Sequence, residues 1–269
     1  MAAPPTPPTL PPAEAGRLRP LAAALARAGT DDDGRPSLEL VAGDLPAAGS
    51  SRIGLLAGTF NPVTRAHAAL AVAGRRAGCD RVVLAMAPAS LAKEGVERAH
   101  ALDRLAWTVA WARRHAWAAV AVAGSGLLVD MAEALGRAAG DAEVVLLLGA
   151  DKAAQLVEPR WYDDHDAAMA RLGAAASALV AGRAGHEAPE LPLASVGRLA
   201  TPAWVPERSA TEARALAEAG GSLKGLVPAP VAAVVARQRV YDADPAPYLA
   251  RAAALDALLR EQRGNVGQR

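Results

Sequence analysis

The sequence predicts an α/β fold with a doubly wound parallel sheet. Short, nearly continuous apolar runs recur along the chain at 52–58, 81–87, 117–124, 143–149 and 176–182. Runs of this kind are typical of strands buried on both faces of a parallel sheet. Segments with helical periodicity separate the first four, at 66–76, 97–115 and 127–139. Alternating strands and helices require crossover connections, and right-handed crossovers between parallel strands build such a sheet.

The helical segments carry their apolar residues on one face. In the longest, Leu102, Leu105, Val109 and Ala112 fall at helical spacing, which indicates a helix packed against the sheet. After the fifth run the pattern is less regular, and helices are expected at 211–219 and 230–238. We therefore expect a sheet followed by a small helical C-terminal part.

The two ends of the chain differ from its middle. Nine of the twenty prolines fall in residues 1–50, beside the acidic run Asp31 to Asp33. We expect this extension to be poorly ordered because its composition buries little apolar surface, although 18–28 could form a helix and "LELVAG" a strand. The folded domain is expected at 51–242, starting near Ser51, with a helical tail at 243–269.

Composition narrows the functional class. The 269 residues are 52% hydrophobic with a net charge of +1, so nothing indicates general affinity for nucleic acid or for a membrane surface. Glycine, proline or charge interrupts every apolar stretch before the roughly 18 residues of a membrane span. The N-terminus lacks a signal core, and Cys79 is the single cysteine. We expect a cytoplasmic protein without disulfides.

The turn after the first strand, "GTFNPVTRAH" (residues 58–67), has the parts of a phosphate site. Ligands of such sheets bind beyond the carboxyl ends of the strands, where the strand order reverses. Gly58 allows backbone to approach a ligand, and the following helix directs unpaired N–H groups at an anion. Thr64 is placed to cap that helix, and His67 lies one turn into it.

Two motifs together resemble the adenylyl- and cytidylyltransferase superfamily. "GTFNPVTRAH" matches its GxxxPx(H/T)xxH signature, and "SATEAR" (residues 209–214) matches its second signature, SxTxxR. Between them, "LLLGADKAAQLVEPRW" resembles the GAD segment and tryptophan of the nicotinate and nicotinamide mononucleotide adenylyltransferases. "LVPAPVAAVVARQRVY" is similar to their C-terminal helix and closing tyrosine. The resemblance covers about Ile53 to Tyr241 and implies a Rossmann-like nucleotidyltransferase fold.

The resemblance implies adenylyl transfer from ATP to a pyridine mononucleotide, forming a dinucleotide and pyrophosphate. His67 would contact the α-phosphate and stabilise the transition state. Thr64 stands where many relatives have histidine, so it could hydrogen-bond a phosphate but could not carry positive charge. Gly58, Thr59 and Phe60 would surround the phosphates and the mononucleotide with backbone.

The second motif would complete the ATP site. Ser209 and Thr211 would present hydroxyl and N–H groups to the phosphates, and Arg214 would pair with the outer phosphates. A plain capping box is the alternative interpretation, because Glu212 lies three residues after Ser209. Both interpretations can hold together.

The resemblance assigns four further residues. Lys93, in the loop after the second strand, stands where relatives carry a basic residue near the phosphates, and a solvated loop lysine is the alternative interpretation. Gly149 and Asp151 of the GAD segment would bind substrate, with Asp151 accepting hydrogen bonds from a ribose. Trp161 would stack on the pyridine ring, or it would be a core residue that anchors the next helix.

The implied cofactor is Mg²⁺, which ATP would bring and which phosphates and waters would hold. No protein metal site is expected, since "DDHD" at 163–166 lacks a second histidine at ligand spacing. The expected partners are ATP and the mononucleotide, and a homo-oligomer is compatible with the sequence.

Three alternatives stay open. The acceptor could be another phosphate, such as pantetheine phosphate, flavin mononucleotide or a small alcohol phosphate. The chain could be a nucleotide-binding regulatory protein without turnover. Nicotinate-preferring bacterial relatives carry a stretch with threonine and tyrosine after the third strand, where this chain has "GSGLLVDMAEAL", so acid or amide preference is undecided.

Overall fold

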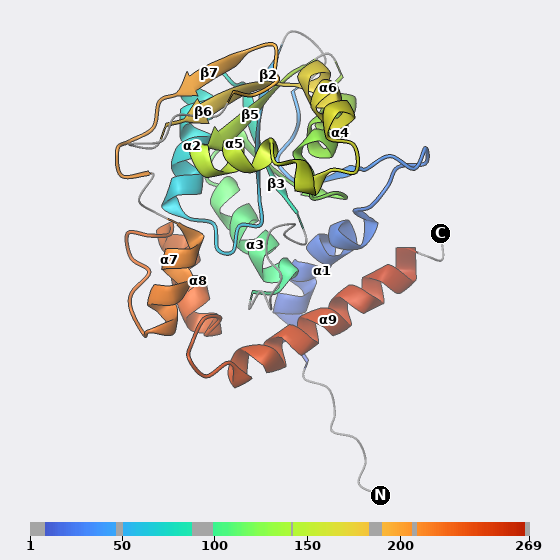
Figure 1. Cartoon of the computed structure of the whole chain (residues 1–269). Helices are drawn as coiled ribbons and strands as arrows, with labels where there is room; N and C mark the ends of the chain where they lie inside the picture. Colours follow the sequence, from blue (N-terminus) through green and yellow to red (C-terminus); the bar gives the residue numbers. More distant parts are fainter. Residues whose placement is uncertain are drawn as a thin grey trace, which may run out of the picture.

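The fold is a doubly wound α/β sheet, as the sequence predicts. The computed structural model describes residues 9–46, 51–87, 99–140, 142–182, 190–205 and 209–266. Within them a seven-stranded sheet has the order β1-β4-β3-β2-β5-β6-β7, and every neighbouring pair is parallel except β1 and β4 (Figure 1). The strands are β1 (Leu38–Ala42), β2 (Arg52–Gly58), β3 (Arg81–Met86), β4 (Ala118–Ala123), β5 (Glu143–Gly149), β6 (Ser177–Ala181) and β7 (Val196–Leu199).

Helices cover both faces of the sheet. One face carries α2 and α3 with the terminal helices and α8, and the other carries α4 and α6 (Figure 1). No helix among the described residues is long and apolar enough to cross a membrane. The helices are α1 (Pro12–Arg27), α2 (Arg65–Arg76), α3 (Ala101–Ala112), α4 (Leu128–Ala139), α5 (Ala150–Leu156), the 3₁₀-helix η1 (Pro159–Trp161), α6 (His165–Ala175), α7 (Ala210–Glu218), α8 (Ala229–Gln238) and α9 (Ala246–Val266).

The continuous apolar runs form strands because the sheet is buried on both sides. Along β3, Val82 and Leu84 enter one core cluster, while Val83 and Ala85 enter the cluster on the opposite face. Side chains of a strand point alternately to the two faces, so both sets must be apolar here. The sheet therefore separates two hydrophobic layers.

Two glycines make room for one leucine where α2 packs on the sheet. A Cβ on Gly74 of α2 would lie 2.3 Å from Cδ1 of Leu147 on β5, and one on Gly54 of β2 would lie 2.8 Å from the same atom. Neither contact is tolerated by real side chains. This packing fixes α2 across β2 and β5, and with it the turn that enters α2.

Residues 9–46 belong to the fold, which corrects the expectation of a poorly ordered extension ending near Ser51. Helix α1 packs against α9, and β1 extends the sheet by pairing with β4. The buried residues of α1 are Leu18, Leu21, Ala22, Ala24 and Leu25. The composition of this segment does not predict its order, because the apolar surface that it lacks comes from α9. Helix α9 lies within the tail that is expected to be helical. Pro11 and Pro12 start α1, where a missing N–H has no cost.

A buried carboxylate ties the terminal helices to the domain. Asp103 on α3 is fully buried and accepts hydrogen bonds from the Tyr248 hydroxyl (2.8 Å), Nε and Nη2 of Arg251 (3.0 and 2.6 Å) and Nε2 of Gln238 (3.3 Å). Nη2 of Arg251 also pairs with Glu14 of α1 at 2.8 Å. Burial raises the pKa of the Tyr248 hydroxyl, which keeps it a donor. One carboxylate thus connects α1, α3, α8 and α9.

We expect Asp103→Ala to lower the free energy of unfolding by about 3 kcal/mol, because it leaves the buried donors without their acceptor. Urea denaturation followed by circular dichroism measures the change. The matched variant Asp163→Ala removes an exposed carboxylate and should change stability by no more than about 0.5 kcal/mol. Equal effects of the two substitutions would contradict the anchoring role of Asp103.

Candidate functional site

The predicted site lies where the strand order reverses. Strand β2 has β3 on one side and β5 on the other. The chain therefore continues from β2 to β3 on one side and from β5 to β6 on the opposite side. In an open α/β sheet this point leaves a crevice at the carboxyl ends of the strands. The turn 58–64 follows β2 there, and the GAD segment follows β5.

The turn after β2 is packed into the protein. Phe60 has a φ of 47°, in the left-handed region, and its side chain is 1% exposed. Such a conformation in a bulky residue is held only by its surroundings. Asn61 is buried too, and its Oδ1 accepts a hydrogen bond of 2.5 Å from the Tyr241 hydroxyl. The turn is therefore shaped before any ligand arrives.

Thr64 and His67 form a capping box at the start of α2. The His67 N–H donates to Thr64 Oγ1 (3.3 Å), and the Thr64 N–H donates to His67 Nδ1 (3.0 Å). Thr64 Oγ1 also lies 2.8 Å from Nδ1. Because Nδ1 accepts from the backbone, a neutral His67 ring carries its proton on Nε2. Thr64 is buried with its hydroxyl at His67, so it orients the histidine.

The two sequence motifs meet in space. Arg214 of α7 donates from Nη1 to the Asn61 carbonyl oxygen at 2.7 Å, although 153 residues separate them, and from Nη2 to Thr211 Oγ1 at 3.1 Å. Ser209 caps α7: its Oγ accepts from the Glu212 N–H at 3.0 Å, which is the capping box that the sequence allowed. The second motif therefore borders the turn after β2.

Arg104 is a site-supporting residue that the sequence analysis missed. It lies on α3, is 2% exposed, and donates from Nη1 to the Thr59 carbonyl oxygen at 3.0 Å. Its side chain thereby holds the backbone of Thr59, the first residue after Gly58. The signal in the sequence is the charged pair "DR" in a largely apolar helical segment, because charged residues that become buried need partners.

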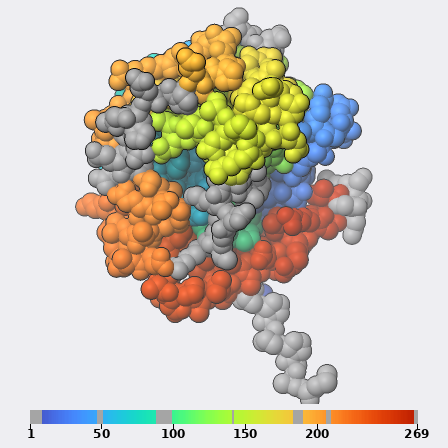
Figure 2. Space-filling model, in the orientation of Figure 1, coloured from blue at the N-terminus to red at the C-terminus, as the bar shows by residue number. Residues whose placement is uncertain are grey.

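The GAD segment turns from β5 into α5. Gly149 is the residue before α5, and a Cβ there would meet open space. Asp151 is exposed in the first turn. The space-filling view shows α5 and α7 on one face of the molecule (Figure 2). Lys93, the remaining predicted residue, lies outside the described residues.

Trp161 is not a core residue. It ends η1, is partly exposed, and donates from Nε1 to Glu158 Oε2 at 3.1 Å. The Arg160 guanidinium lies 4.6 Å from the centre of its ring. The interpretation of Trp161 as a core anchor is therefore wrong, while the stacking interpretation stays a prediction. Arg160 shows that a flat cationic group already finds room at this ring.

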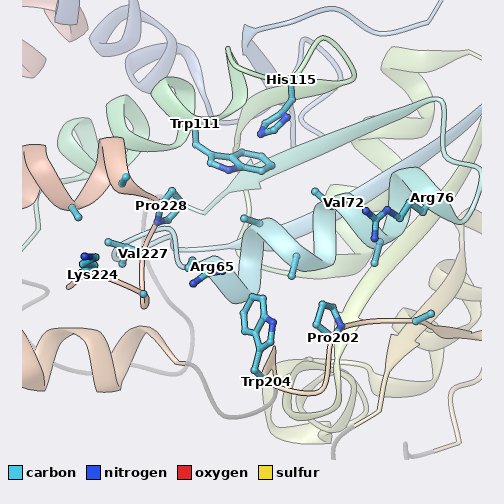
Figure 3. Close-up of a pocket in the computed structure, with 17 residues that line it drawn as sticks. Arg65, Val72, Arg76, Trp111, His115, Pro202, Trp204, Lys224, Val227 and Pro228 are labelled. Atoms are coloured by element: carbon cyan, nitrogen blue, oxygen red, sulfur yellow. The ribbon is translucent and has the colours of Figure 1, made fainter. Parts of the chain in front are cut away.

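A groove of about 740 Å³ runs along the outer side of α2 (Figure 3). Trp111 and His115 lie on one side of α2, and Pro202 and Trp204 lie on the other. The Arg65 guanidinium lies 5.0 Å from the centre of the Trp204 ring. None of the predicted site residues in the described part of the chain lines this groove. The groove therefore follows a side of α2 that His67 does not line.

Comparison with known proteins identifies the fold. No protein-family model and no curated protein matches the chain. Among solved structures, Plasmodium falciparum nicotinic acid mononucleotide adenylyltransferase complexed with NaAD matches with a TM-score of 0.57 and 12% identity, over 71% of this chain and 97% of that chain. The same enzyme complexed with APC matches over the same shares, with a TM-score of 0.54 and 12% identity. The likeness is one of fold.

Thr64→Val should lower the free energy of unfolding by about 1 kcal/mol, because valine keeps the volume but removes the capping oxygen. Equilibrium unfolding in urea measures it. Thr211→Val, which removes an exposed hydroxyl from the start of α7, is the matched control and should cost less than half as much. A Thr64 variant as stable as the unmodified protein would show that this cap contributes nothing.

Proposed function

We propose that this protein is a nucleotidyltransferase that transfers the adenylyl group of ATP to nicotinate or nicotinamide mononucleotide, producing the dinucleotide and pyrophosphate of NAD biosynthesis. The observation that carries the proposal is the hydrogen bond from Arg214 to the Asn61 carbonyl, which joins the two motifs in one site. The reversal of strand order at that site supports it. The fold shared with a nicotinic acid mononucleotide adenylyltransferase agrees with it.

The reaction is an in-line displacement at the α-phosphorus of ATP. A phosphate oxygen of the mononucleotide forms the new P–O bond, the bond from the α-phosphorus to the bridging oxygen breaks, and pyrophosphate leaves with that electron pair. The attacking phosphate is already an anion, so no strong base is needed. Catalysis then rests on positioning two polyanions and on donors directed at the developing charge.

His67 is the donor placed for the α-phosphate. Thr64 holds Nδ1, so Nε2–H is the ring atom that donates to a non-bridging oxygen. The fixed ring spares reorganisation during the reaction. Arg214 supplies permanent positive charge beside the same turn, and a guanidinium has five N–H donors, of which the contacts to Asn61 and Thr211 use two. The outer phosphates take the others.

The proposed cofactor is Mg²⁺, bound to ATP. It would neutralise charge on the phosphate oxygens. In the described part of the chain no three His, Cys, Asp or Glu side chains gather closely enough to hold a metal ion. We propose that phosphates and waters coordinate the ion, with the protein contributing Arg214 and backbone N–H groups toward the phosphates.

Pyrophosphate release tests the proposed function. The purified protein is incubated with ATP and Mg²⁺ plus nicotinate mononucleotide, nicotinamide mononucleotide, pantetheine phosphate or flavin mononucleotide. We expect release with a pyridine mononucleotide, together with formation of its dinucleotide. Release only with another acceptor would replace the proposed substrate. Absence of release with all four would point to a nucleotide-binding protein without turnover and would contradict the proposal.

His67→Ala should lower kcat by about 10²–10³-fold, the usual effect of losing one donor to a transition-state oxygen. Steady-state pyrophosphate release measures the change, and circular dichroism checks the fold. The control His115→Ala removes an imidazole from the groove on the outer side of α2 and should change kcat by less than about threefold. Near-normal turnover of the His67 variant would refute the role given to His67.

A further inference from the structure

A small cavity lies between the loop that follows β4 and helix α5, which follows β5. Its volume is about 20 Å³. Gly126 and Leu127, from the loop after β4, line one side, and Lys152 and Gln155 of α5 line another, with Trp161 and Tyr162 completing it. A space of this size holds about one water molecule. It also holds one oxygen of a ligand's carboxylate, but not an aromatic ring.

Lys152 brings a positive charge to this cavity without a matching carboxylate. Its Nζ donates to the Gln155 amide oxygen at 2.9 Å, and no aspartate or glutamate is among the lining residues in the described chain. Burial lowers the pKa of the Lys152 ammonium, and no carboxylate of the described residues opposes that shift. A partly buried ammonium without a counter-charge is costly. An anionic ligand group would remove that cost.

Asp130 of α4, which binds the loop after β4, is already paired with a positive charge. Asp130 accepts from Nη2 of Arg171 at 2.9 Å and from the Ser125 hydroxyl at 2.6 Å. Ser125 Oγ in turn accepts from the Leu127 N–H at 3.1 Å. These bonds hold the loop 125–127 in place, and the Arg171 guanidinium neutralises the Asp130 carboxylate. The cavity wall is therefore rigid and its uncompensated charge is positive.

The opposite wall is held as well. The Tyr162 hydroxyl donates to the Leu156 carbonyl at 2.8 Å, which closes the segment between α5 and η1. The Trp161 indole is fixed to Glu158. The aromatic ring and the ammonium thus line one cavity in a fixed relation. This is the arrangement that a planar ring with an acidic substituent requires, the ring beside the indole and the substituent at the ammonium.

We propose that Lys152 binds the carboxylate of the pyridine ring and so makes this site prefer nicotinate mononucleotide to nicotinamide mononucleotide. This inference rests on the proposed function. A carboxylate and a carboxamide differ little in size, so a cavity of this volume separates them by charge and not by shape. The carboxylate gains a charge-assisted hydrogen bond and supplies the missing counter-charge, whereas the amide leaves the ammonium uncompensated.

A charge series at residue 152 tests the inference. The values of kcat/KM for the two mononucleotides are measured with the unmodified protein, Lys152→Met and Lys152→Glu. We expect Lys152→Met to lower kcat/KM for nicotinate mononucleotide by about 10–100-fold, with less than about threefold change for the amide. Lys152→Glu should reduce the ratio of acid to amide further. Lys224→Met, a lysine of the separate groove on α2, should leave the ratio unchanged.

Equal losses for both substrates, or an unchanged ratio in both variants, would overturn the inference and show a merely structural lysine. Calorimetric titration of each mononucleotide without ATP distinguishes this failure from failure of the proposed function. Turnover with neither pyridine mononucleotide would refute the function. If the unmodified protein binds the acid more tightly than the amide, and Lys152→Met abolishes this difference, the carboxylate site is still supported. Equal binding of acid and amide by the unmodified protein would refute the carboxylate site. Thermal unfolding confirms that each variant is folded.

Discussion

The position of β2 between β3 and β5 is the constraint on which the site depends. Because β2 is buried by helices on both faces and paired on both edges, its carboxyl end can point only into the crevice where the strand order reverses. Leu147 of β5 fits against Gly54 and Gly74, so α2 packs on β2 and β5 with no space for a side chain at either glycine. The entry to α2, with Thr64 and His67, is thus set by packing in the core.

The same turn is held from three further directions. Arg104 binds the Thr59 carbonyl from α3, Tyr241 binds the Asn61 side chain, and Arg214 binds the Asn61 carbonyl. Donors from three parts of the chain thus converge on two residues of the loop, Thr59 and Asn61. A loop with so many external donors behaves as a rigid part of the scaffold, which suits a site that works by positioning charged groups.

Much of the sheet could be predicted because its strands are continuous apolar runs, and these leave few alternatives. The expectation of a poorly ordered extension is wrong for residues 9–46, because Leu18 and Leu21 of α1 pack with α9, and no local sequence pattern predicts a contact between segments so far apart. The sequence does not predict β7 as a buried strand, because its edge position leaves Val196 exposed and it has no continuous apolar run. The motifs predict His67 and Arg214 as site residues, whereas the interactions of Lys152 and Arg104 depend on tertiary neighbours that spacing does not encode.

The packing of α1 on α9 has a consequence for synthesis of the chain. Helix α1 is synthesised before α9, and β1 and the rest of the sheet lie between them in the sequence. At about 5–20 residues per second, the apolar face of α1 waits on the order of ten to forty seconds for α9. During that interval the newly made N-terminus exposes leucines and a glutamate destined for Arg251. The apolar face of α1 therefore stays without its α9 partner until synthesis has passed Val266.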